Sequence, residues 1–254
     1  MTGIGRWLPG QEPSPYAGRR LICLPYAGGA AAAYQIWRWL APDGLQVCPV
    51  ELPGRGARFG EDLFQRLTPL VETLADAIAP ALDRPFAIFG HSMGALLAFE
   101  LTRTLRKFGL PEPEHLFVSG AVAPGTPRRE RPLHDAPDNE IRRKLRTLGG
   151  TPEELLGNDE LMELMLPVLR ADFAVLETYE YREQAPLAVP ITVLAGRSDP
   201  VVPVSALRGW RDQSTVPLRL RLFPGGHFYL HDAAADIVRL ISDTLRHARQ
   251  VERK

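Results

Sequence analysis

Short apolar runs recur along the chain, and they predict strands that are buried on both faces of a sheet. Each run is bounded by Pro or Gly and is too short for a stable helix. The runs are Leu21–Pro25, Leu45–Leu52, Phe86–Phe89, Leu116–Val122, Ile191–Ala195 and Leu218–Phe223. The helix-length segments between them are Ala33–Leu40, Leu63–Leu82, Met93–Phe108, Val204–Asp212 and Leu230–Ala248. Strands that alternate with helices predict an α/β fold with a mostly parallel central sheet flanked by helices.

Residues 124–186 interrupt this alternation with a stretch that holds helical patterns and no convincing strand. Apolar residues recur at helical spacing in Asn139–Leu148 and Asp159–Tyr181, and a shorter helical pattern lies at Pro152–Leu156. Ligands of open α/β sheets bind at the carboxyl ends of the strands, and an insertion after a strand lies near that crevice. We therefore expect a helical lid insertion or chamber wall; the alternative is an additional helical layer without a gating role.

Residues 1–18 are rich in Pro and Gly and lack apolar periodicity, so they are expected to form a surface tail. The folded domain is then expected to comprise residues 19–254. The tail lacks the apolar core of a signal peptide, and the chain has no run of about 18 apolar residues. Export by that route and a membrane-spanning segment are therefore not expected.

Composition and charge narrow the function classes further. The 254-residue chain carries 30 Lys and Arg and 30 Asp and Glu, so its formal net charge is zero. Attraction of the whole molecule to nucleic acid or to an anionic membrane is therefore not expected. The two cysteines, Cys23 and Cys48, lie in apolar runs, which favours a role in the core and excludes a disulfide framework. This cysteine usage favours a reduced, cytoplasmic setting.

A candidate nucleophile lies between the third apolar run and the helical segment that follows it. The sequence Gly90-His91-Ser92-Met93-Gly94 has the pattern G-x-S-x-G and joins a predicted strand directly to a predicted helix. In such a nucleophile elbow the turn is so sharp that small residues are needed two positions on either side of the serine. The turn lifts the hydroxyl of Ser92 above the sheet at a helix N-terminus.

A serine hydroxyl needs a base, and the base needs an acid that orients it. In this architecture the two follow the serine in the order acid, then histidine. Asp199 lies just past the carboxyl end of the fifth predicted strand, and His227 lies in the equivalent position after the sixth. The alternative roles are a turn residue for Asp199 and a helix cap for His227. His231 is the only rival histidine, and its spacing from His227 does not favour a metal site without a matching carboxylate signature.

The tetrahedral oxyanion of such a mechanism needs two backbone N–H donors. Met93, the residue after the serine, is expected to supply one, and Ala27 in the Gly-rich turn after the first strand is expected to supply the other. A plain strand-to-helix turn is the alternative for that segment. The turn at residues 54–56 is not a dinucleotide fingerprint, because Gly60 falls one residue beyond the required third glycine.

Five segments carry a resemblance to one family. They are LPYAGG at residues 24–29, ELPGRG at 51–56, FGHSMGA at 89–95, GRSDP at 196–200 and PGGHF at 224–228. From about Leu21 to Leu245 the chain resembles the stand-alone type II thioesterases of the α/β-hydrolase superfamily, which serve polyketide synthases and nonribosomal peptide synthetases. The resemblance implies hydrolysis of stalled or aberrant acyl units from the phosphopantetheine arm of an acyl or peptidyl carrier protein, under a helical lid.

The matching positions also imply roles for single residues. The catalytic triad would be Ser92, Asp199 and His227. The oxyanion donors would be Ala27 and Met93. His227 would deprotonate the serine, the acyl group would pass to the serine, and water activated by His227 would release it. No cofactor is required beyond the phosphopantetheine arm of the substrate, and the chain is expected to act as a monomer.

Carrier proteins are usually acidic, so a basic rim at the entrance would favour docking. The candidates are Arg55, Arg58, Arg128, Arg129, Arg131 and the cluster Arg142, Arg143, Lys144 and Arg146. The alternative for such runs is a solvated helix face.

Three other functions stay open on the sequence. An esterase or lactonase that acts on a free small molecule would use the same triad. A type I thioesterase domain cut from a larger synthase is disfavoured, because the chain opens with Met1 and has no carrier domain ahead of it. A catalytically inactive hydrolase fold that serves as a binding module is disfavoured by the intact elbow, acid and histidine.

Overall fold

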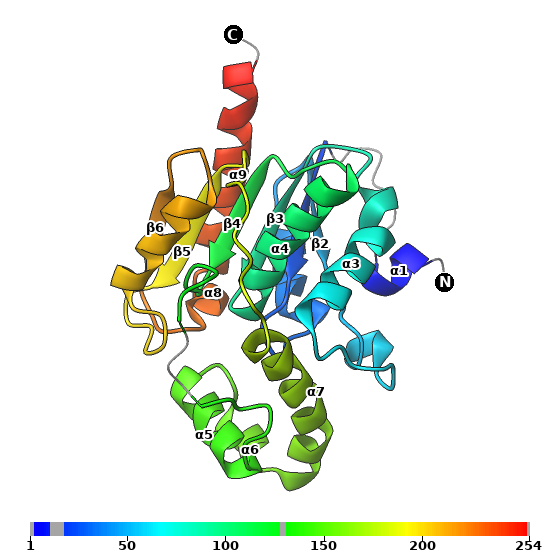
Figure 1. The fold of residues 1–254 in the computed structure, drawn as a ribbon, viewed down its shortest axis with the longest axis vertical. Coiled ribbons are helices and arrows are strands. Elements are labelled where there is room, and N and C mark those ends of the chain that lie inside the picture. The colour runs from blue at the N-terminus through cyan, green and yellow to red at the C-terminus, as the bar shows by residue number, and fades with distance from the viewer. Residues whose placement is uncertain (1–2, 11–17, 128–130, 253–254) are drawn as a thin grey trace.

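The computed structural model describes residues 3–10, 18–127 and 131–252, and its centre is one parallel sheet of six strands (Figure 1). The strands are β1 (Arg19–Leu24), β2 (Leu45–Pro49), β3 (Phe86–His91), β4 (His115–Ser119), β5 (Ile191–Gly196) and β6 (Arg219–Phe223). Their order across the sheet is β2-β1-β3-β4-β5-β6. All neighbours pair in parallel, so the predicted α/β class is confirmed.

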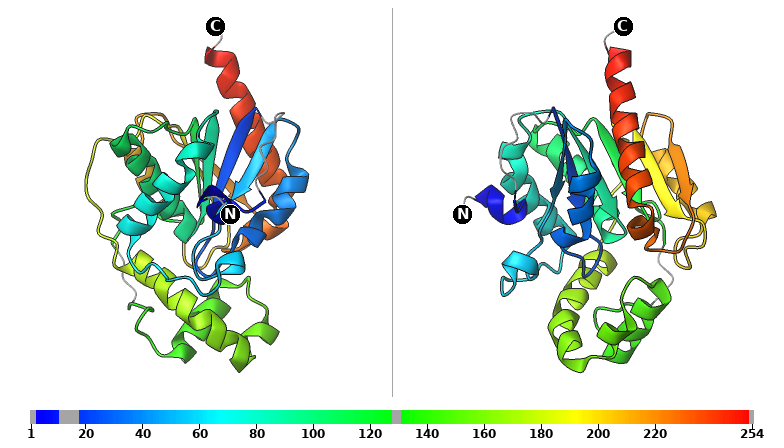
Figure 2. Two further views of the ribbon diagram at one scale, coloured as in Figure 1. Left: turned by 90° about the vertical axis from the view of Figure 1, so that its right-hand side faces the viewer. Right: turned by 180° about the vertical axis from the view of Figure 1, so that it is seen from behind.

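Helices cover both faces of this sheet (Figure 2). On one face α3 packs against α4 and α1, and on the other α2 packs against α9. The elements are α1 (Gly3–Trp7), η1 (Ala31–Tyr34), α2 (Gln35–Leu40), η2 (Gly56–Arg58), α3 (Leu67–Ile78), η3 (Ala79–Ala81), α4 (Met93–Phe108), η4 (Val204–Gln213), α8 (Tyr229–Asp232) and α9 (Ala234–Glu252). Those written η are 3₁₀ helices. In the described part of the chain, no helix is both long and apolar enough to cross a membrane.

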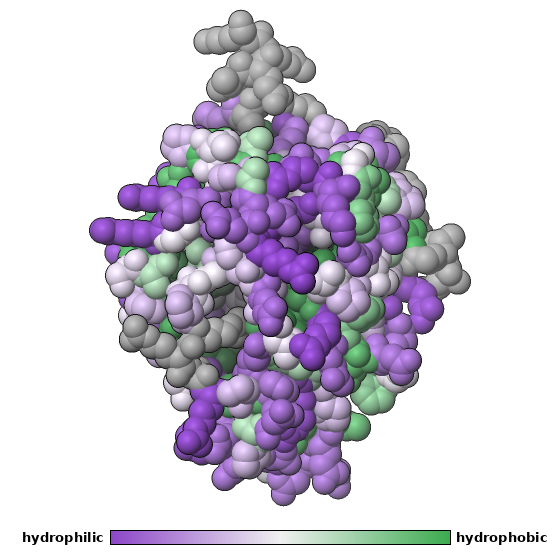
Figure 3. Space-filling model, viewed as in Figure 1, coloured by the Kyte–Doolittle hydropathy of each residue, from purple (hydrophilic) through white to green (hydrophobic). Residues whose placement is uncertain are grey.

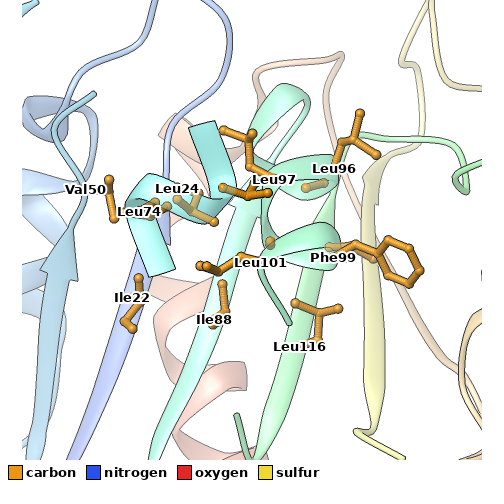
Figure 4. Close-up of a cluster of buried hydrophobic side chains, with 14 of the residues drawn as sticks. Ile22, Leu24, Val50, Leu74, Ile88, Leu96, Leu97, Phe99, Leu101 and Leu116 are labelled. Atoms are coloured by element: carbon orange, nitrogen blue, oxygen red, sulfur yellow. The ribbon is translucent and has the colours of Figure 1, made fainter. Parts of the chain in front are cut away.

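The core below α3 and α4 fixes where the candidate nucleophile lies. Ile22, Ile88 and Leu116 project from three neighbouring strands toward Leu97 and Leu101 on α4 (Figure 4). All five side chains are fully buried. Because these contacts seat α4 along its length, they also fix its N-terminus, which follows the predicted serine.

Burial of the strands follows their place in the sheet. Strands β1, β3, β4 and β5 are buried at every residue, as their apolar composition predicts. The expectation is wrong for β6, where Arg219, Leu220 and Arg221 are exposed. This strand lies at the edge of the sheet, where charged side chains protect the open backbone from further pairing.

The expected surface tail is wrong for residues 3–10. Gly3–Trp7 forms α1, and Trp7 and Leu8 are buried in the core beside α3. The carbonyl oxygen of Trp7 accepts a hydrogen bond of 2.8 Å from the backbone N–H of Glu51, and the guanidinium of Arg58 lies 4.1 Å from the centre of its ring. The N-terminal helix is therefore part of the domain. Residues 1–2 and 11–17 of the expected tail lie outside the described residues.

The predicted helical insertion is present between β4 and β5. It contains α5 (Asp138–Leu148), α6 (Glu153–Leu156) and α7 (Asp159–Glu177), and it lies beyond the carboxyl ends of the strands (Figure 1). These helices share a hydrophobic cluster of their own, which includes Ile141, Met162 and Leu169. The outer surface of the unit is mainly hydrophilic (Figure 3). A body with its own core and a polar exterior can pack over the sheet as one unit.

Both cysteines are buried thiols that form no disulfide within the described residues, and their place in the core is as the sequence predicts. Burial raises the pKa of the Cys48 thiol to about 12 and raises the pKa of the Cys23 thiol well above its usual value. Reactivity requires the thiolate, so both residues act as small apolar side chains of the core.

Candidate active site

Ser92 sits in a strained turn between β3 and α4. Its backbone has φ 53° and ψ −113°, and it is the only residue other than glycine with a positive φ in the described part of the chain. A Cβ atom at Gly90 would overlap the carbonyl group of Gly94, and one at Gly94 would overlap the carbonyl group of Leu24. Such close backbone packing forces the sharp strand-to-helix turn of a nucleophile elbow. The hydroxyl of Ser92 is thereby presented at the N-terminus of α4.

Asp199 and His227 meet at the carboxyl ends of β5 and β6. His227 Nδ1 lies 2.7 Å from Asp199 Oδ2, and the side chains are 3% and 0% exposed. The other carboxylate oxygen of Asp199 accepts backbone N–H bonds of 2.8 Å from Val201 and 3.1 Å from Val202. Burial acts to raise the pKa of Asp199, but the bonds from His227 and from the two N–H groups outweigh it and lower that pKa. The carboxylate therefore stays ionised and orients the imidazole.

His91, the residue before Ser92 in the elbow, packs beside His227. The ring of His91 is fully buried, and its centre lies 5.0 Å from that of His227. His91 Nδ1 lies 2.9 Å from Ser119 Oγ, which in turn lies 2.6 Å from the hydroxyl of Tyr229. Burial lowers the pKa of His91 well below its usual range, so the ring is neutral. The ring packs against those of His227 and Phe228.

Among the described residues, two atoms of the candidate triad carry no hydrogen bond of their own. Within the described part of the chain, neither Ser92 Oγ nor His227 Nε2 has a hydrogen-bond partner. In enzymes without substrate, the hydrogen bond between the nucleophile and its base is often long, and it shortens only in the complex with substrate. Since Nδ1 of His227 is hydrogen-bonded to Asp199, Nε2 is the ring nitrogen that is left to accept a proton.

His231, the rival histidine, has a different environment. Its Nε2 lies 3.4 Å from the hydroxyl of Tyr26, and its ring stacks on Phe228 with centroids 5.9 Å apart. Among the described residues, no carboxylate is hydrogen-bonded to this ring as Asp199 is to that of His227. Among the residues that the structure describes, no group of three His, Cys, Asp or Glu side chains is placed to hold a metal ion.

The loop after β1 forms a tight turn close to the elbow, because a Cβ atom at Gly94 would lie 2.8 Å from the carbonyl oxygen of Pro25. The N–H of Gly29 donates to the carbonyl oxygen of Tyr26 at 2.8 Å, so Ala27 and Gly28 occupy the two central positions. The N–H of Gly28 is taken by a carboxylate oxygen of Asp172 at 2.7 Å. In the described part of the chain, the N–H groups of Ala27 and Met93 have no acceptor. These are the two donors that the sequence predicts for an oxyanion.

Arg55, Arg58 and Asp172 have roles that the sequence did not predict. Arg55 and Arg58, expected in a basic docking rim, are each 7% exposed, and that expectation is wrong for both. Arg55 pairs with Asp172 on α7, and Arg58 pairs with Glu61. Asp172 lies on the inner face of α7, and no local pattern marks it. A single polar residue within an apolar helix face is the only signal the sequence offers.

The remaining members of the expected rim lie on the helical insertion or before it. Arg142 pairs with Asp159, and Arg146 pairs with Glu153. Arg131 and Arg143 are exposed. Arg128 and Arg129 lie outside the described residues.

The glycine turn at residues 54–56 has no dinucleotide-binding geometry. It leads into η2, a 3₁₀ helix of three residues, whereas a pyrophosphate needs the N-terminus of a longer helix. A Cβ atom at Gly56 would overlap the carboxylate of Glu51, so this turn packs on an acidic side chain. The turn shapes the loop beside the site instead of cradling a phosphate.

The parallel sheet, the strained serine and the Asp–His pair together define a serine hydrolase of the α/β-hydrolase type. The chain matches the thioesterase domain family over residues 19–245, and it belongs to that family. It is 39% identical to the gramicidin S biosynthesis protein GrsT of Aneurinibacillus migulanus, over 97% of this chain and 96% of that protein. The type II thioesterase BorB of the borrelidin biosynthetic cluster superposes with a TM-score of 0.84 at 38% identity, covering 93% of this chain and 96% of BorB. These matches confirm the resemblance to type II thioesterases.

One relative carries a different name. The chain is 41% identical to the protein named linear gramicidin dehydrogenase LgrE of Brevibacillus parabrevis, over 95% of this chain and 93% of that protein. The geometry at residues 54–56 gives this chain no glycine fingerprint for a nicotinamide dinucleotide at that turn. The site described above is that of a hydrolase.

Proposed function

We propose that this protein hydrolyses acyl thioesters on the phosphopantetheine arm of acyl or peptidyl carrier proteins and so clears stalled or aberrant acyl units from a biosynthetic assembly line. The observations that carry the proposal are the buried Asp199–His227 pair and its place next to the elbow, in a chain of the thioesterase family. The ring centre of His227 lies 5.0 Å from that of His91, the residue before the strained Ser92. The relatives named above belong to gramicidin S and borrelidin biosynthesis, which supports a role of the same class.

In the proposed mechanism, Nε2 of His227 accepts the proton of the Ser92 hydroxyl as the oxygen attacks the thioester carbonyl. The oxyanion is stabilised by the N–H groups of Met93 and Ala27. The carrier thiolate then leaves; its thiol has a pKa of about 8.5, so it needs little protonation. Water activated by His227 hydrolyses the acyl-serine, while Asp199 stabilises the charged imidazole.

The helical unit α5–α7 is proposed to cover the acyl chain during this reaction. It lies over the carboxyl ends of the strands, where Ser92 and His227 are found (Figure 1). Gly150 of this unit packs against Phe228, the residue after His227, because a Cβ atom at Gly150 would overlap that ring. The unit therefore contacts the site directly, which favours a lid over a remote helical layer.

The partner is proposed to be a carrier-protein domain, and the enzyme is proposed to act as a monomer in the cytoplasm. The reaction requires no cofactor other than the arm that the substrate carries. Size-exclusion chromatography with light scattering tests the monomer directly, and an elution mass of twice 28.2 kDa would contradict it.

The experiment that tests the function compares one acyl group on three leaving groups. The kcat/KM is measured for the acyl group on a holo carrier protein, on N-acetylcysteamine and on p-nitrophenol. The proposal predicts the highest value for the carrier thioester. The highest value for the free ester would instead assign the chain to esterases of small molecules, which use the same triad.

A further inference from the structure

A buried ion pair joins the helical unit to the loop that follows β2. Arg55 Nη1 lies 2.7 Å from Asp172 Oδ2, and Arg55 Nη2 lies 2.8 Å from Asp172 Oδ1. The side chains are 8% and 4% exposed. Two parallel hydrogen bonds make this the strongest geometry for such a pair. Burying two charges is costly unless their remaining hydrogen-bonding groups also have partners. The other partners of the pair therefore show which part of the structure it stabilises.

Those other partners include the turn that contains Ala27. The N–H of Gly28 donates to Asp172 Oδ2 at 2.7 Å, and Arg55 Nη1 donates to the carbonyl oxygen of Gly29 at 3.1 Å. The pair thus holds two successive residues of this turn. It does so from two segments, α7 and the loop after β2, that are distant from the turn in sequence.

These contacts decide which N–H group of the turn faces the site. A β-turn leaves the N–H groups of its two central residues without a partner inside the turn. Asp172 takes the N–H of Gly28, so only that of Ala27 is left for an oxyanion. Gly28 has a φ of +74°, and a Cβ atom there would lie 2.8 Å from Leu169, one helical turn before Asp172. Helix α7 therefore fixes both the orientation and the position of this residue.

The charges of the pair also bear on the reaction. The Asp172 carboxylate accepts from the residue next to Ala27, so its negative charge lies near the place where an oxyanion would form. An uncompensated anion there would oppose the transition state, and the interaction is strong in a buried site. The Arg55 guanidinium compensates that charge while it holds the turn.

We propose that Arg55 and Asp172 are positioning residues of the oxyanion hole, which hold the turn at residues 26–29 in its catalytic conformation and neutralise each other beside it. This inference rests on the proposed function and deepens it. It assigns to one lid helix, α7, a direct part in transition-state stabilisation. It also predicts an asymmetry: loss of Arg55 leaves a buried anion near the oxyanion, whereas loss of Asp172 leaves a cation.

The test uses Arg55→Gln, Asp172→Asn and the double variant, with Glu114→Gln as the matched control. Glu114 pairs with Arg19 at 2.6 Å at the opposite ends of the strands, so its loss perturbs an ion pair but not the turn. An acyl-N-acetylcysteamine thioester serves as substrate. A trifluoromethyl ketone, which forms a hemiketal oxyanion on Ser92, serves as the probe of the oxyanion hole.

We expect Arg55→Gln to lower kcat about 100-fold, the lower end of the loss found when a donor of an oxyanion hole is removed, and Asp172→Asn to lower it less, about tenfold. KM should change less than about threefold, and affinity for the ketone should fall by the same factor as kcat. The double variant holds no unpaired charge, so it should fold if a single variant does not, and it should recover part of the loss. Arg55→Lys keeps the positive charge but cannot form the two parallel hydrogen bonds of the guanidinium, so its kcat should lie between those of Arg55→Gln and the wild type.

Three results separate the possible failures. A folded Asp172→Asn and a folded Arg55→Gln with wild-type kcat would overturn the inference. So would a loss of thermal stability in these variants, as in Glu114→Gln, with kcat and ketone affinity unchanged. A wild-type enzyme that cleaves the small thioester but no acyl carrier would instead overturn the proposed function and leave the inference standing.

Discussion

The Nδ1 atom of His227 lies 2.7 Å from Oδ2 of Asp199, although the two residues are 28 positions apart and follow different strands. The fully buried carboxylate is held by backbone N–H groups on its other oxygen. It can therefore orient the imidazole without turning away.

The contact between Asp199 and His227 predicts a large loss of kcat when the carboxylate is replaced by an amide. Asp199→Asn should lower kcat about 10³- to 10⁴-fold, because asparagine stabilises the wrong tautomer of His227. Turnover of an acyl thioester measures the loss, and circular dichroism checks the fold. Ser198→Ala, an exposed position on the same loop, should keep wild-type activity. A value of kcat within tenfold of the wild type for Asp199→Asn would remove Asp199 from the mechanism.

The close packing at Gly90 predicts a large loss of stability when a side chain is added there. A Cβ atom there would overlap the backbone of Gly94, so Gly90→Ala should lose more than about 4 kcal/mol of stability and fold poorly. Gly44 is the control: its φ is +87°, but a Cβ atom there would meet nothing within 4 Å. Gly44→Ala should cost only the left-handed strain of about 1–2 kcal/mol. Urea unfolding compares the two, and equal costs would contradict the close packing at Gly90.

His115 predicts a loss of stability in weak acid. Its ring is buried, with Nε2 2.8 Å from the hydroxyl of Thr192. Burial, with a smaller contribution from Arg219, lowers the pKa of His115 from 6.5 to about 4. Between these two pKa values, His115 is therefore protonated in the unfolded chain and neutral in the folded chain. The stabilisation is complete above pH 6.5 and is lost as the pH falls toward 4.

The variant His115→Gln keeps a hydrogen-bonding group but cannot titrate in this range. Between pH 7 and pH 4, its free energy of unfolding should fall by roughly 3 kcal/mol less than that of the wild type. Urea unfolding at several pH values measures the difference. Parallel pH profiles of the two proteins would show that His115 does not carry the effect.

Two adjacent glycines of the helical unit test its contact with the site. Gly149 and Gly150 have φ of +72° and +79°, so alanine is strained at both. Only Gly150 packs on Phe228; a Cβ atom at Gly149 would meet nothing within 4 Å. Gly150→Ala should displace the ring beside His227 and lower kcat/KM for an acyl carrier at least about tenfold, since small misplacements of a catalytic group have large effects. Gly149→Ala should lose stability through its backbone strain alone and keep near wild-type kcat/KM. An equal loss of kcat/KM in both variants would contradict the contact between Gly150 and Phe228.

The strands and most helices could be predicted from the sequence because their signals are local. Alternating apolar runs with Pro and Gly boundaries located all six strands, and Met93–Phe108 was placed at its observed bounds. The helix at Gly3–Trp7 could not be predicted, because it is short and lies among Pro and Gly. Its burial depends on partners such as Arg58 and Glu51, which are distant in sequence.

In the candidate site too, residues with a local sequence signal could be predicted, and contacts between distant segments could not. Ser92, Asp199 and His227 could be located because each follows the carboxyl end of a strand, and parallel strands end at one edge. Arg55 and Asp172 could not be paired, because they are 117 positions apart and meet only when α7 packs over the sheet. For that reason Arg55 resembled a surface residue of a docking rim.

The central claim is that Ser92 releases acyl groups from carrier proteins. The most direct measurement is intact-mass analysis of a holo carrier protein loaded with acetyl, propionyl or longer acyl groups and incubated with the wild type or with Ser92→Ala. The account predicts that the acyl mass disappears with the wild type and persists with Ser92→Ala. Persistence of every acyl group with the wild type, while a small ester is still cleaved, would contradict it.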